Sequence, residues 1–430
     1  MKKKIDNIIE KNIKLIIVSF LFLQPTLDII AAVSINLIHT EITISSIIRL
    51  LFLFFSIYYV FFLDSTEHKK RNEIFIGLIF GYILLFAGII LYYKGIGAFT
   101  YEIRNTLNTF YLPIILIAFI DMFKQYKIKI DFKKIIVLYL IYLVFVTIPN
   151  LTHTGFNSYA HSKTGSVGWF LSANAVGNIL SILLPLVILY IIEFKTKKIY
   201  KGIIAILILY VFASMGTKVP ILSLGICVLV NFIYYFIYCI KEKKYLYNVI
   251  ISILMIVMII ASIIVIPKTS FYKNIQIHKE FLGFDSYLEV FTNYELLDHF
   301  VFSQRLTFLG NTHKSWEKAE PLEKILGIGY IENYSTDNAS MKTIEIDYFD
   351  LLYRNGIVGF IIYFIIVGPI IINSFKGKIK SIKDLEFKTS IILILLLAIF
   401  SGHVLITPAV SIFVALIFTL KEYGFKEKTT

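Results

Sequence analysis

The chain has few charged residues and almost no cysteine. Of its 430 residues, 17% are charged and 57% are hydrophobic, whereas a soluble globular protein is about 25% charged and 45–50% apolar. This balance excludes an ordinary soluble domain and indicates a polytopic membrane protein. The two cysteines, Cys227 and Cys239, lie in one apolar run. A helix would place them about 18 Å apart, too far for a disulfide.

Several motifs of nucleotide and metal chemistry are also absent. The sequence has no P-loop, no GxGxxG, no HExxH and no two aspartates spaced i,i+2, so the usual patterns for holding a nucleotide or a divalent ion are missing. The net charge of +13 comes from short basic clusters between apolar runs, not from a basic and aromatic surface. We therefore expect no cofactor, no metal ion and no nucleic-acid partner.

Twelve apolar segments reach or approach the length of about 20 residues that a membrane-spanning helix requires. They lie at residues 15–37, 42–63, 74–93, 105–123, 135–151, 169–194, 202–216, 219–240, 246–266, 348–375, 389–406 and 408–420. The seventh and the last are short. The sequence thus predicts an all-α polytopic membrane protein with about 12 transmembrane helices, nine in residues 1–266 and three in residues 347–430.

The distribution of lysine and arginine predicts the orientation in the membrane. If the N-terminus is cytoplasmic, the inner segments carry 28 of these residues and the short outer loops carry 4. Such a bias indicates that both termini are cytoplasmic. The first apolar run is long and lacks a small-x-small cleavage site, so we expect it to remain as a helix.

One segment, residues 267–346, is far longer than the other connections. Its 80 residues are rich in aromatic side chains and show helical spacing, so we expect a mostly helical extracytoplasmic cap on the membrane surface. Long structured loops in compact proteins are usually functional. We therefore expect the site residues to lie in and around this segment.

Carboxylates gather where the cap meets the next apolar run, in IEIDYFDLLYRNGIVGF. Asp350 and Arg354 are spaced i,i+4 and suit a structural pair near a helix start. Glu345 and Asp347 precede the helix on the predicted outer side. A carboxylate at a partly desolvated interface can act as a general base. We predict a catalytic role for Glu345 or Asp347.

Scattered cations on the predicted outer face suit a phosphate-bearing substrate. Arg305 in SQRLTFLG, Lys218 in SMGTKVP and Arg104 in TYEIRNT are the candidates for binding a diphosphate. Two of them have a structural alternative: Arg305 could pair with an acid of the cap, and Lys218 could mark the membrane interface. Arg49, inside the second span, is either functional or paired with Asp28.

Together these features suit a lipid diphosphate that carries a sugar. Cations at headgroup depth would hold the diphosphate, aromatic rings would pack on the sugar, and a carboxylate would deprotonate the acceptor hydroxyl. Diphosphate leaves readily once its charge is neutralised, so this chemistry needs no metal.

Five stretches resemble motifs of the O-antigen ligase and polymerase superfamily of bacterial membrane glycosyltransferases, and their order along the chain supports this resemblance. They are WFLSANAVGNILSILLPL, SMGTKVPIL, SQRLTFLG, PLEKILGIGY and EIDYFDLLYRNGIVG. The ligase-like region covers about residues 200–370. The resemblance implies a GT-C-like fold and an inverting enzyme on the outer face of a bacterial plasma membrane. It also implies a polyprenyl-diphosphate-linked oligosaccharide as donor.

Three other functions remain open beside a polysaccharide polymerase. A ligase would move the lipid-linked glycan to a lipid, a wall polymer or a protein, but ligases usually carry histidine where this chain has Glu345, which favours a polymerase. A flippase for lipid-linked oligosaccharides also has about twelve helices, but commonly shows inverted repeats, which are not evident here. A non-catalytic scaffold would need no carboxylate at this position. Expected partners are membrane lipids, the lipid-linked oligosaccharide and a chain-length regulator.

Overall fold

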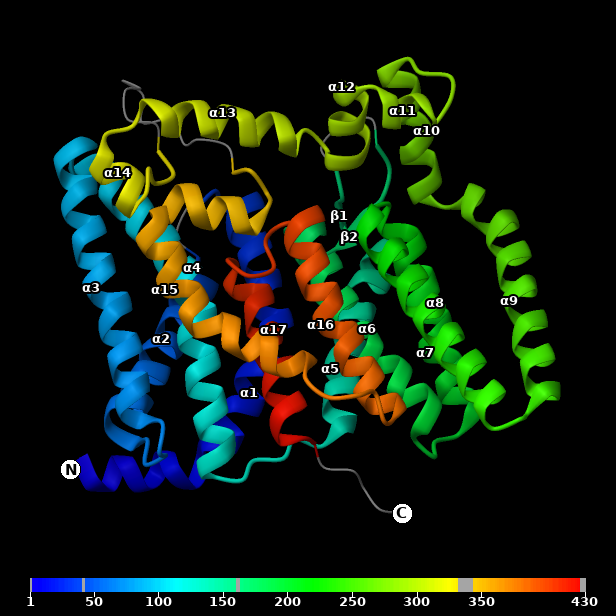
Figure 1. The fold of residues 1–430 in the computed structure, drawn as a ribbon, viewed down its shortest axis with the longest axis horizontal. Helices are drawn as coiled ribbons and strands as arrows, with labels where there is room; N and C mark the ends of the chain where they lie inside the picture. Colours follow the sequence, from blue (N-terminus) through cyan, green and yellow to red (C-terminus); the bar gives the residue numbers. More distant parts are fainter. Residues whose placement is uncertain (1, 41–42, 160–162, 332–342, 426–430) are drawn as a thin grey trace. The chain divides into compact units, whose positions relative to one another are not determined.

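The computed structural model describes residues 2–40, 43–159, 163–331 and 343–425, and its regular structure is almost entirely helical (Figure 1). In these ranges, twelve α-helices have 15 or more residues, close to the predicted positions. They are α1 Lys2–Asn36, α2 Ile44–Tyr58, α3 Lys69–Tyr93, α4 Ile96–Gln125, α5 Phe132–Leu151, α6 Ala173–Glu193, α7 Lys198–Met215, α8 Lys218–Lys241, α9 Tyr245–Val265, α15 Asp347–Phe375, α16 Ile382–Phe400 and α17 Pro408–Tyr423. The predicted all-α polytopic fold is confirmed.

Ten helices of the described chain are long and apolar enough to cross a membrane. The predicted seventh span, although short in the sequence, corresponds to α7 and meets this criterion with 18 residues. The two remaining long helices are α16 and α17, of 19 and 16 residues. The last predicted segment is therefore a short helix, as its length in the sequence indicated.

The predicted cap is helical over its described residues. Its elements are the 3₁₀ turn η2 Ile266–Lys268, α10 Ser270–Leu282, α11 Glu289–Thr292, α12 Tyr294–Leu297, the π-helical turn η3 Asp298–Phe302, α13 Arg305–Lys318 and α14 Pro321–Leu326. Elsewhere the short elements are the π-helical turn η1 Tyr59–Leu63 and an antiparallel pair of strands, β1 Phe156–Asn157 and β2 Ser166–Gly168. Helices thus account for most of the described cap, and residues 327–331 and 343–346 are irregular.

Local sequence signals explain where several of the cap helices begin and end. Thr269 caps α10 by accepting a hydrogen bond from Tyr272 N at 3.3 Å, and Gly283, with φ of 66°, ends the helix in the left-handed conformation. Pro321 is at the start of α14, where the backbone N–H that proline lacks would have no partner within the helix. Glu320 forms a capping box with Glu323.

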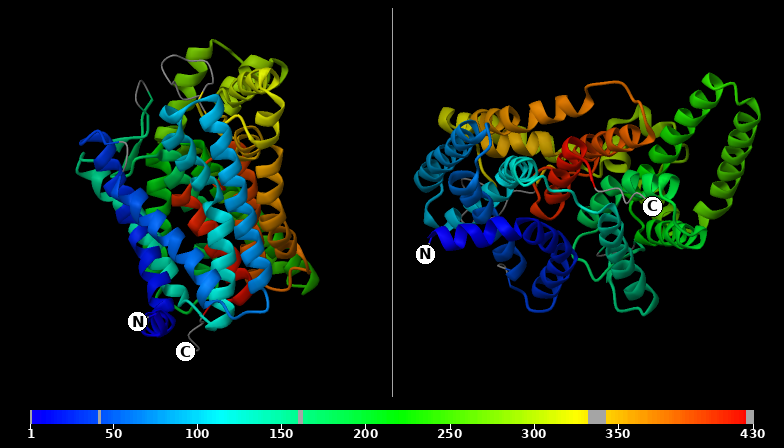
Figure 2. Two further views of the ribbon diagram at one scale, coloured as in Figure 1. Left: turned by 90° about the vertical axis from the view of Figure 1, so that its left-hand side faces the viewer. Right: turned by 90° about the horizontal axis from the view of Figure 1, so that it is seen from below.

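The chain divides into two compact units. The first comprises Met1–Ile135, Val290–Lys378 and Ile394–Thr430. Its centre is α17, which packs along α4 (Figure 2) and buries every residue from 409 to 420. A helix that is apolar on all sides requires such an interior position. In this unit α1 begins and α17 ends at one end, and α13 and α14 lie at the opposite end (Figure 1).

The second unit comprises Ile136–Glu289 and Ile379–Leu393. Here α6 packs against α8, and α8 against α9. Asn274 joins α10 to the end of α7 and to the segment before β2, because its Nδ2 donates to Gly216 O at 2.9 Å and to Thr164 O at 2.6 Å. By contrast, α9 has no buried residue, so its side chains are placed to face hydrocarbon.

A kink in α15 shapes the first unit near the candidate site. Gly356 has φ of 64° and ψ of −178°, which interrupts the helix after its first two turns. A Cβ at Gly356 would lie 2.4 Å from Gly327 N, and a Cβ at Gly327 would lie 2.2 Å from Arg354 O. Only glycine tolerates this approach. The kink therefore separates a short leading segment, residues 347–355, from the membrane-spanning remainder.

Candidate active site

Arg305, the first residue of α13, lies at the centre of the candidate site and is 6% exposed. Its Nε donates to Glu345 O at 3.0 Å and its Nη2 to Glu345 Oε2 at 2.7 Å. Nη1 donates to Phe302 O at 3.1 Å, and Nη2 also donates to Ser401 O at 3.2 Å. Four of the five guanidinium N–H groups are thus engaged by the protein, and they join α13 to two other segments.

Glu345 retains access to solvent. Its side chain is 26% exposed, and its Oε1 lies 3.9 Å from Nε2 of His403. Burial raises the pKa of this carboxyl, but the interaction with His403 and the charges of Arg305 and His403 outweigh burial, so the pKa lies below its ordinary value. Glu345 is therefore a carboxylate at neutral pH, with Oε2 held by Arg305.

His403, in the turn between α16 and α17, is a member of the site that the sequence did not reveal. Its side chain is 29% exposed. Burial lowers the pKa of the imidazole, but the interaction with Glu345 and the charges of Asp347 and Asp350 raise it more, so the pKa lies above its ordinary value. No spacing motif marks His403. Only the approach of two distant loops brings it to Glu345.

Asp347 is fully buried and accepts three backbone hydrogen bonds from the turn that carries His403. The donors are His403 N to Oδ1 at 2.6 Å, Val404 N to Oδ2 at 2.8 Å and Leu405 N to Oδ2 at 2.7 Å. Burying a carboxylate is unfavourable unless its oxygens are hydrogen-bonded. Asp347 therefore holds the 403–405 turn in place.

Asp350 holds the other loop in the same way. It is 1% exposed and accepts hydrogen bonds from Ile344 N at 3.0 Å and Glu345 N at 2.9 Å. Arg354 Nε lies 3.7 Å from Asp350 Oδ1, which confirms the predicted pair. Arg354 also donates to Gly329 O at 3.1 Å, so this pair connects the loop to the segment after α14.

Several residues around the site have a left-handed backbone conformation. Residues with φ between 55° and 69° there are Ser303, Gln304, Glu345, Gly402 and His403. For residues other than glycine this conformation costs about 1–2 kcal/mol each, and such strain clusters at functional sites. Gly402 is required by close approach as well, since a Cβ there would lie 2.5 Å from Glu345 O.

The other predicted phosphate-binding residues lie outside this cluster. Lys218 is the first residue of α8, in the second unit, so its phosphate role rests on the sequence alone. Arg104 of α4 lines a pocket of about 390 Å³ together with Ile35, His39, Thr40 and Tyr101. Its guanidinium carbon lies 5.4 Å from the centroid of the Tyr101 ring.

Inside the second span, the structural alternative for Arg49 is confirmed. Arg49 forms an ion pair with Asp28 and donates from Nε to Gln24 Oε1 at 3.0 Å. This charge is therefore neutralised within the bundle of α1 and α2.

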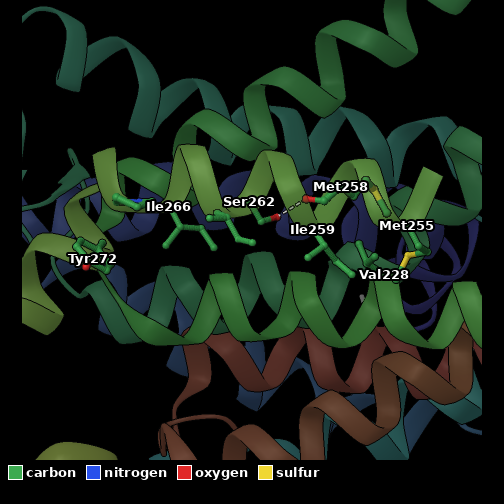
Figure 3. A pocket seen from close by; sticks show the side chains of 9 residues that line it. Val228, Met255, Met258, Ile259, Ser262, Ile266 and Tyr272 are labelled. Carbon is green, nitrogen blue, oxygen red and sulfur yellow. Dashed lines mark hydrogen bonds between the residues drawn. The ribbon is translucent and has the colours of Figure 1, made fainter. Parts of the chain in front are cut away.

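An apolar pocket of about 410 Å³ lies between α8 and α9 in the second unit (Figure 3). Its lining residues are Val228, Met255, Met258, Ile259, Ser262, Ile263, Ile266, Pro267 and Tyr272. The one hydroxyl of α9 in this lining, Ser262, donates to Met258 O at 2.8 Å, so it is satisfied by its own helix. The pocket thus presents hydrocarbon and thioether surface.

Within the described ranges, no group of three or more histidine, cysteine, aspartate or glutamate side chains could hold a metal ion. Whether the reaction is independent of metal stays a prediction.

The fold and the site together define a class, that of polytopic α-helical membrane proteins in which a helical segment holds a partly exposed carboxylate. The family model of the O-antigen ligase like membrane proteins matches residues 10–285 and 292–421, and the chain belongs to this family. Membership identifies it as a multi-pass membrane protein of the glycosyltransferase and ligase type, with lipid-linked glycan and membrane lipid as substrates. Comparison with the curated proteins gave no match.

Proposed function

We propose that this protein is an extracytoplasmic, inverting and metal-independent glycosyltransferase. It polymerises the repeat units of a polyprenyl-diphosphate-linked oligosaccharide into a cell-surface or exported polysaccharide at a bacterial plasma membrane, with both termini in the cytoplasm. The observation that carries the proposal is the partly exposed Glu345 carboxylate, held by a buried arginine beside a histidine. The family supports the transfer of lipid-linked glycans in general, and the choice of polymerase is our inference.

The geometry favours Glu345 over Asp347 as the general base. Asp347 is fully buried and both of its oxygens accept backbone hydrogen bonds, so it has no access to a substrate hydroxyl. In Glu345 the contact with Arg305 occupies Oε2 and leaves Oε1 to receive a proton. Oε1 takes the proton of the acceptor hydroxyl as that oxygen attacks the anomeric carbon. The bond from this carbon to the diphosphate breaks, with inversion.

The engagement of Arg305 changes its assignment. With four N–H groups donating to the protein, the guanidinium is better suited to positioning Glu345 than to binding the diphosphate directly. Lys218 and Arg104 remain the sequence-based candidates for contact with the diphosphate. Cations placed where charge develops stabilise the transition state strongly.

Two alternatives differ in what happens to the lipid-linked glycan. A ligase would use the same base but a different acceptor, namely a lipid, a wall polymer or a protein. A flippase would move the glycan across the bilayer without forming a bond. Such transport would not use the carboxylate that Arg305 holds, so the flippase is the weaker of the two alternatives.

The test uses the full chain reconstituted in liposomes with a purified lipid-linked oligosaccharide, and without added nucleotide or metal. Longer lipid-linked chains support the polymerase, transfer only to an added acceptor supports the ligase, and translocation without new bonds supports the flippase. Glu345→Gln should reduce turnover by about 10²–10⁴-fold, the usual contribution of a general base.

The matched control is Glu295→Gln, which makes the same substitution at an exposed position of the cap helix α12. We expect it to retain wild-type turnover. Wild-type turnover in Glu345→Gln, with the control also active, would eliminate Glu345 as the base.

A further inference from the structure

We propose that His403 is a second catalytic residue of this transfer, acting as an imidazolium that gives a proton to the departing diphosphate and recovers one from Glu345. The inference rests on the proposed function and adds to it a group from a different part of the chain. It is carried by the arrangement of His403, Glu345 and the two buried carboxylates that hold their loops.

His403 is held in a strained backbone conformation by a hydrogen bond to a buried carboxylate. Its φ is 60°, a conformation that is unfavourable for a residue with a side chain. The backbone is kept there by the hydrogen bond from His403 N to buried Asp347. The facing residue, Glu345, has φ of 61° and is held by buried Asp350 through its own N–H. Two strained residues are thus fixed opposite each other.

The side-chain geometry leaves this pair open to a substrate. Nε2 of His403 and Oε1 of Glu345 are 3.9 Å apart, with 29% and 26% of the side chains exposed. This distance exceeds that of a closed hydrogen bond. Both groups can therefore contact a substrate while they remain close enough for a proton to pass between them once either moves slightly.

The charges around His403 favour its protonated form. The carboxylates of Glu345, Asp347 and Asp350 face it from the end of the cap and the first turn of α15. Among the described residues, Arg305 of α13 brings a positive charge to this position, and it forms an ion pair with Glu345. Asp350 is in turn partly balanced by Arg354.

Two tyrosines of α15 also reach the segment before α17. Tyr348 donates its hydroxyl to Leu395 O at 3.4 Å, and Tyr363 donates to Leu405 O at 3.1 Å. As hydroxyl donors they are neutral, so they add no charge that would oppose the imidazolium.

The proton balance closes over one turnover. The acceptor hydroxyl gives its proton to Glu345 Oε1 while its oxygen forms the new glycosidic bond. The bond between the anomeric carbon and the diphosphate oxygen breaks, and the imidazolium of His403 protonates the released diphosphate. The proton on Glu345 then passes to the neutral imidazole, which restores the carboxylate and the imidazolium. The net result is a transferred sugar and a protonated diphosphate.

The test is the pH dependence of kcat for the reconstituted protein and three variants. Wild type should give a bell-shaped profile, with an acid limb from Glu345 and a basic limb from His403. His403→Asn keeps a side chain that tolerates the left-handed backbone, so it should fold. It should lower kcat by about 10²-fold and lose the basic limb. His403→Lys retains a cation and should recover part of kcat, with the basic limb moved to higher pH.

The control, His313→Gln, removes an exposed histidine of α13 and should keep the wild-type profile. A basic limb that persists unchanged in His403→Asn would overturn the role of His403 while leaving Glu345 as the base. The same holds for a wild-type rate that increases with pH through the titration of His403, since neutral imidazole would then be the active form. Absence of any transfer by wild type would overturn both proposals.

A second readout is independent of turnover. The imidazole of His403 can be titrated by NMR in wild type and in Glu345→Gln, and its pKa should fall when the carboxylate is removed. An unchanged titration would show that the two side chains do not interact and would contradict the proton transfer between them.

Discussion

The close approach of Gly402 to Glu345 allows the geometry of the site to be perturbed without touching either proposed catalytic side chain. Gly402 has φ of 67°, and a Cβ added there would lie 2.5 Å from Glu345 O and 2.7 Å from Glu345 C. An ordinary van der Waals contact begins at 3.4 Å. In Gly402→Ala the loop carrying Glu345 and the turn carrying His403 must therefore separate by about 0.9 Å.

This separation should affect catalysis more than stability. The left-handed alanine costs about 1–2 kcal/mol, a tolerable loss for a folded domain. A displacement of about 1 Å between reacting groups can reduce a rate about 10²-fold. We expect Gly402→Ala to reach the membrane folded and to lose about 10²-fold in kcat, measured in the liposome assay. Thermal unfolding in detergent would report the change in stability.

Gly283→Ala supplies the matched control. Gly283 has φ of 66°, and nothing lies within 4 Å of an added Cβ. This variant therefore has the same unfavourable left-handed alanine but no steric clash. It should lose similar stability and keep its turnover. Wild-type turnover in Gly402→Ala, or an equal loss of turnover in both variants, would refute the reasoning that the spacing of the two loops controls the reaction.

Two further predictions concern the groups that hold the site. Asp347→Asn replaces one accepting oxygen with an amide donor against backbone N–H groups, so it should destabilise the protein by about 1–3 kcal/mol for each N–H left without an acceptor, seen as a lower melting temperature. Arg305→Lys removes the guanidinium that helps to lower the pKa of Glu345. That pKa should rise, so the acid limb of the pH–rate profile should move to higher pH. An unmoved acid limb would argue against this coupling.

The sequence predicted the helical framework because hydrophobic runs and basic clusters are local signals. The described helices occur close to the predicted segments, and the described part of the long segment before α15 is mostly helical as expected. The sequence also predicted the pair Arg354–Asp350 and offered Asp28 as a partner for Arg49, and both pairs are present. An i,i+4 spacing on a helix, or a single charge inside a membrane span, leaves few oppositely charged side chains within reach. Such ion pairs can therefore be predicted from the sequence.

The inner arrangement of the site could not be predicted from the sequence. His403 and Asp347 are 56 residues apart, and their contact depends on how two loops fold against each other. The roles of Glu345 and Asp347 were indistinguishable as residue types, because both are acids beside a helix start. Their different burial is the observation on which our proposal of Glu345 as the base rests.

The break in α15 has a mechanical consequence. Asp347 and Asp350 stand one helical turn apart on residues 347–355, ahead of Gly356, and each is bonded to the peptide of one member of the Glu345–His403 pair. A displacement of this short segment about Gly356 would therefore move both loops, because each loop is hydrogen-bonded to it.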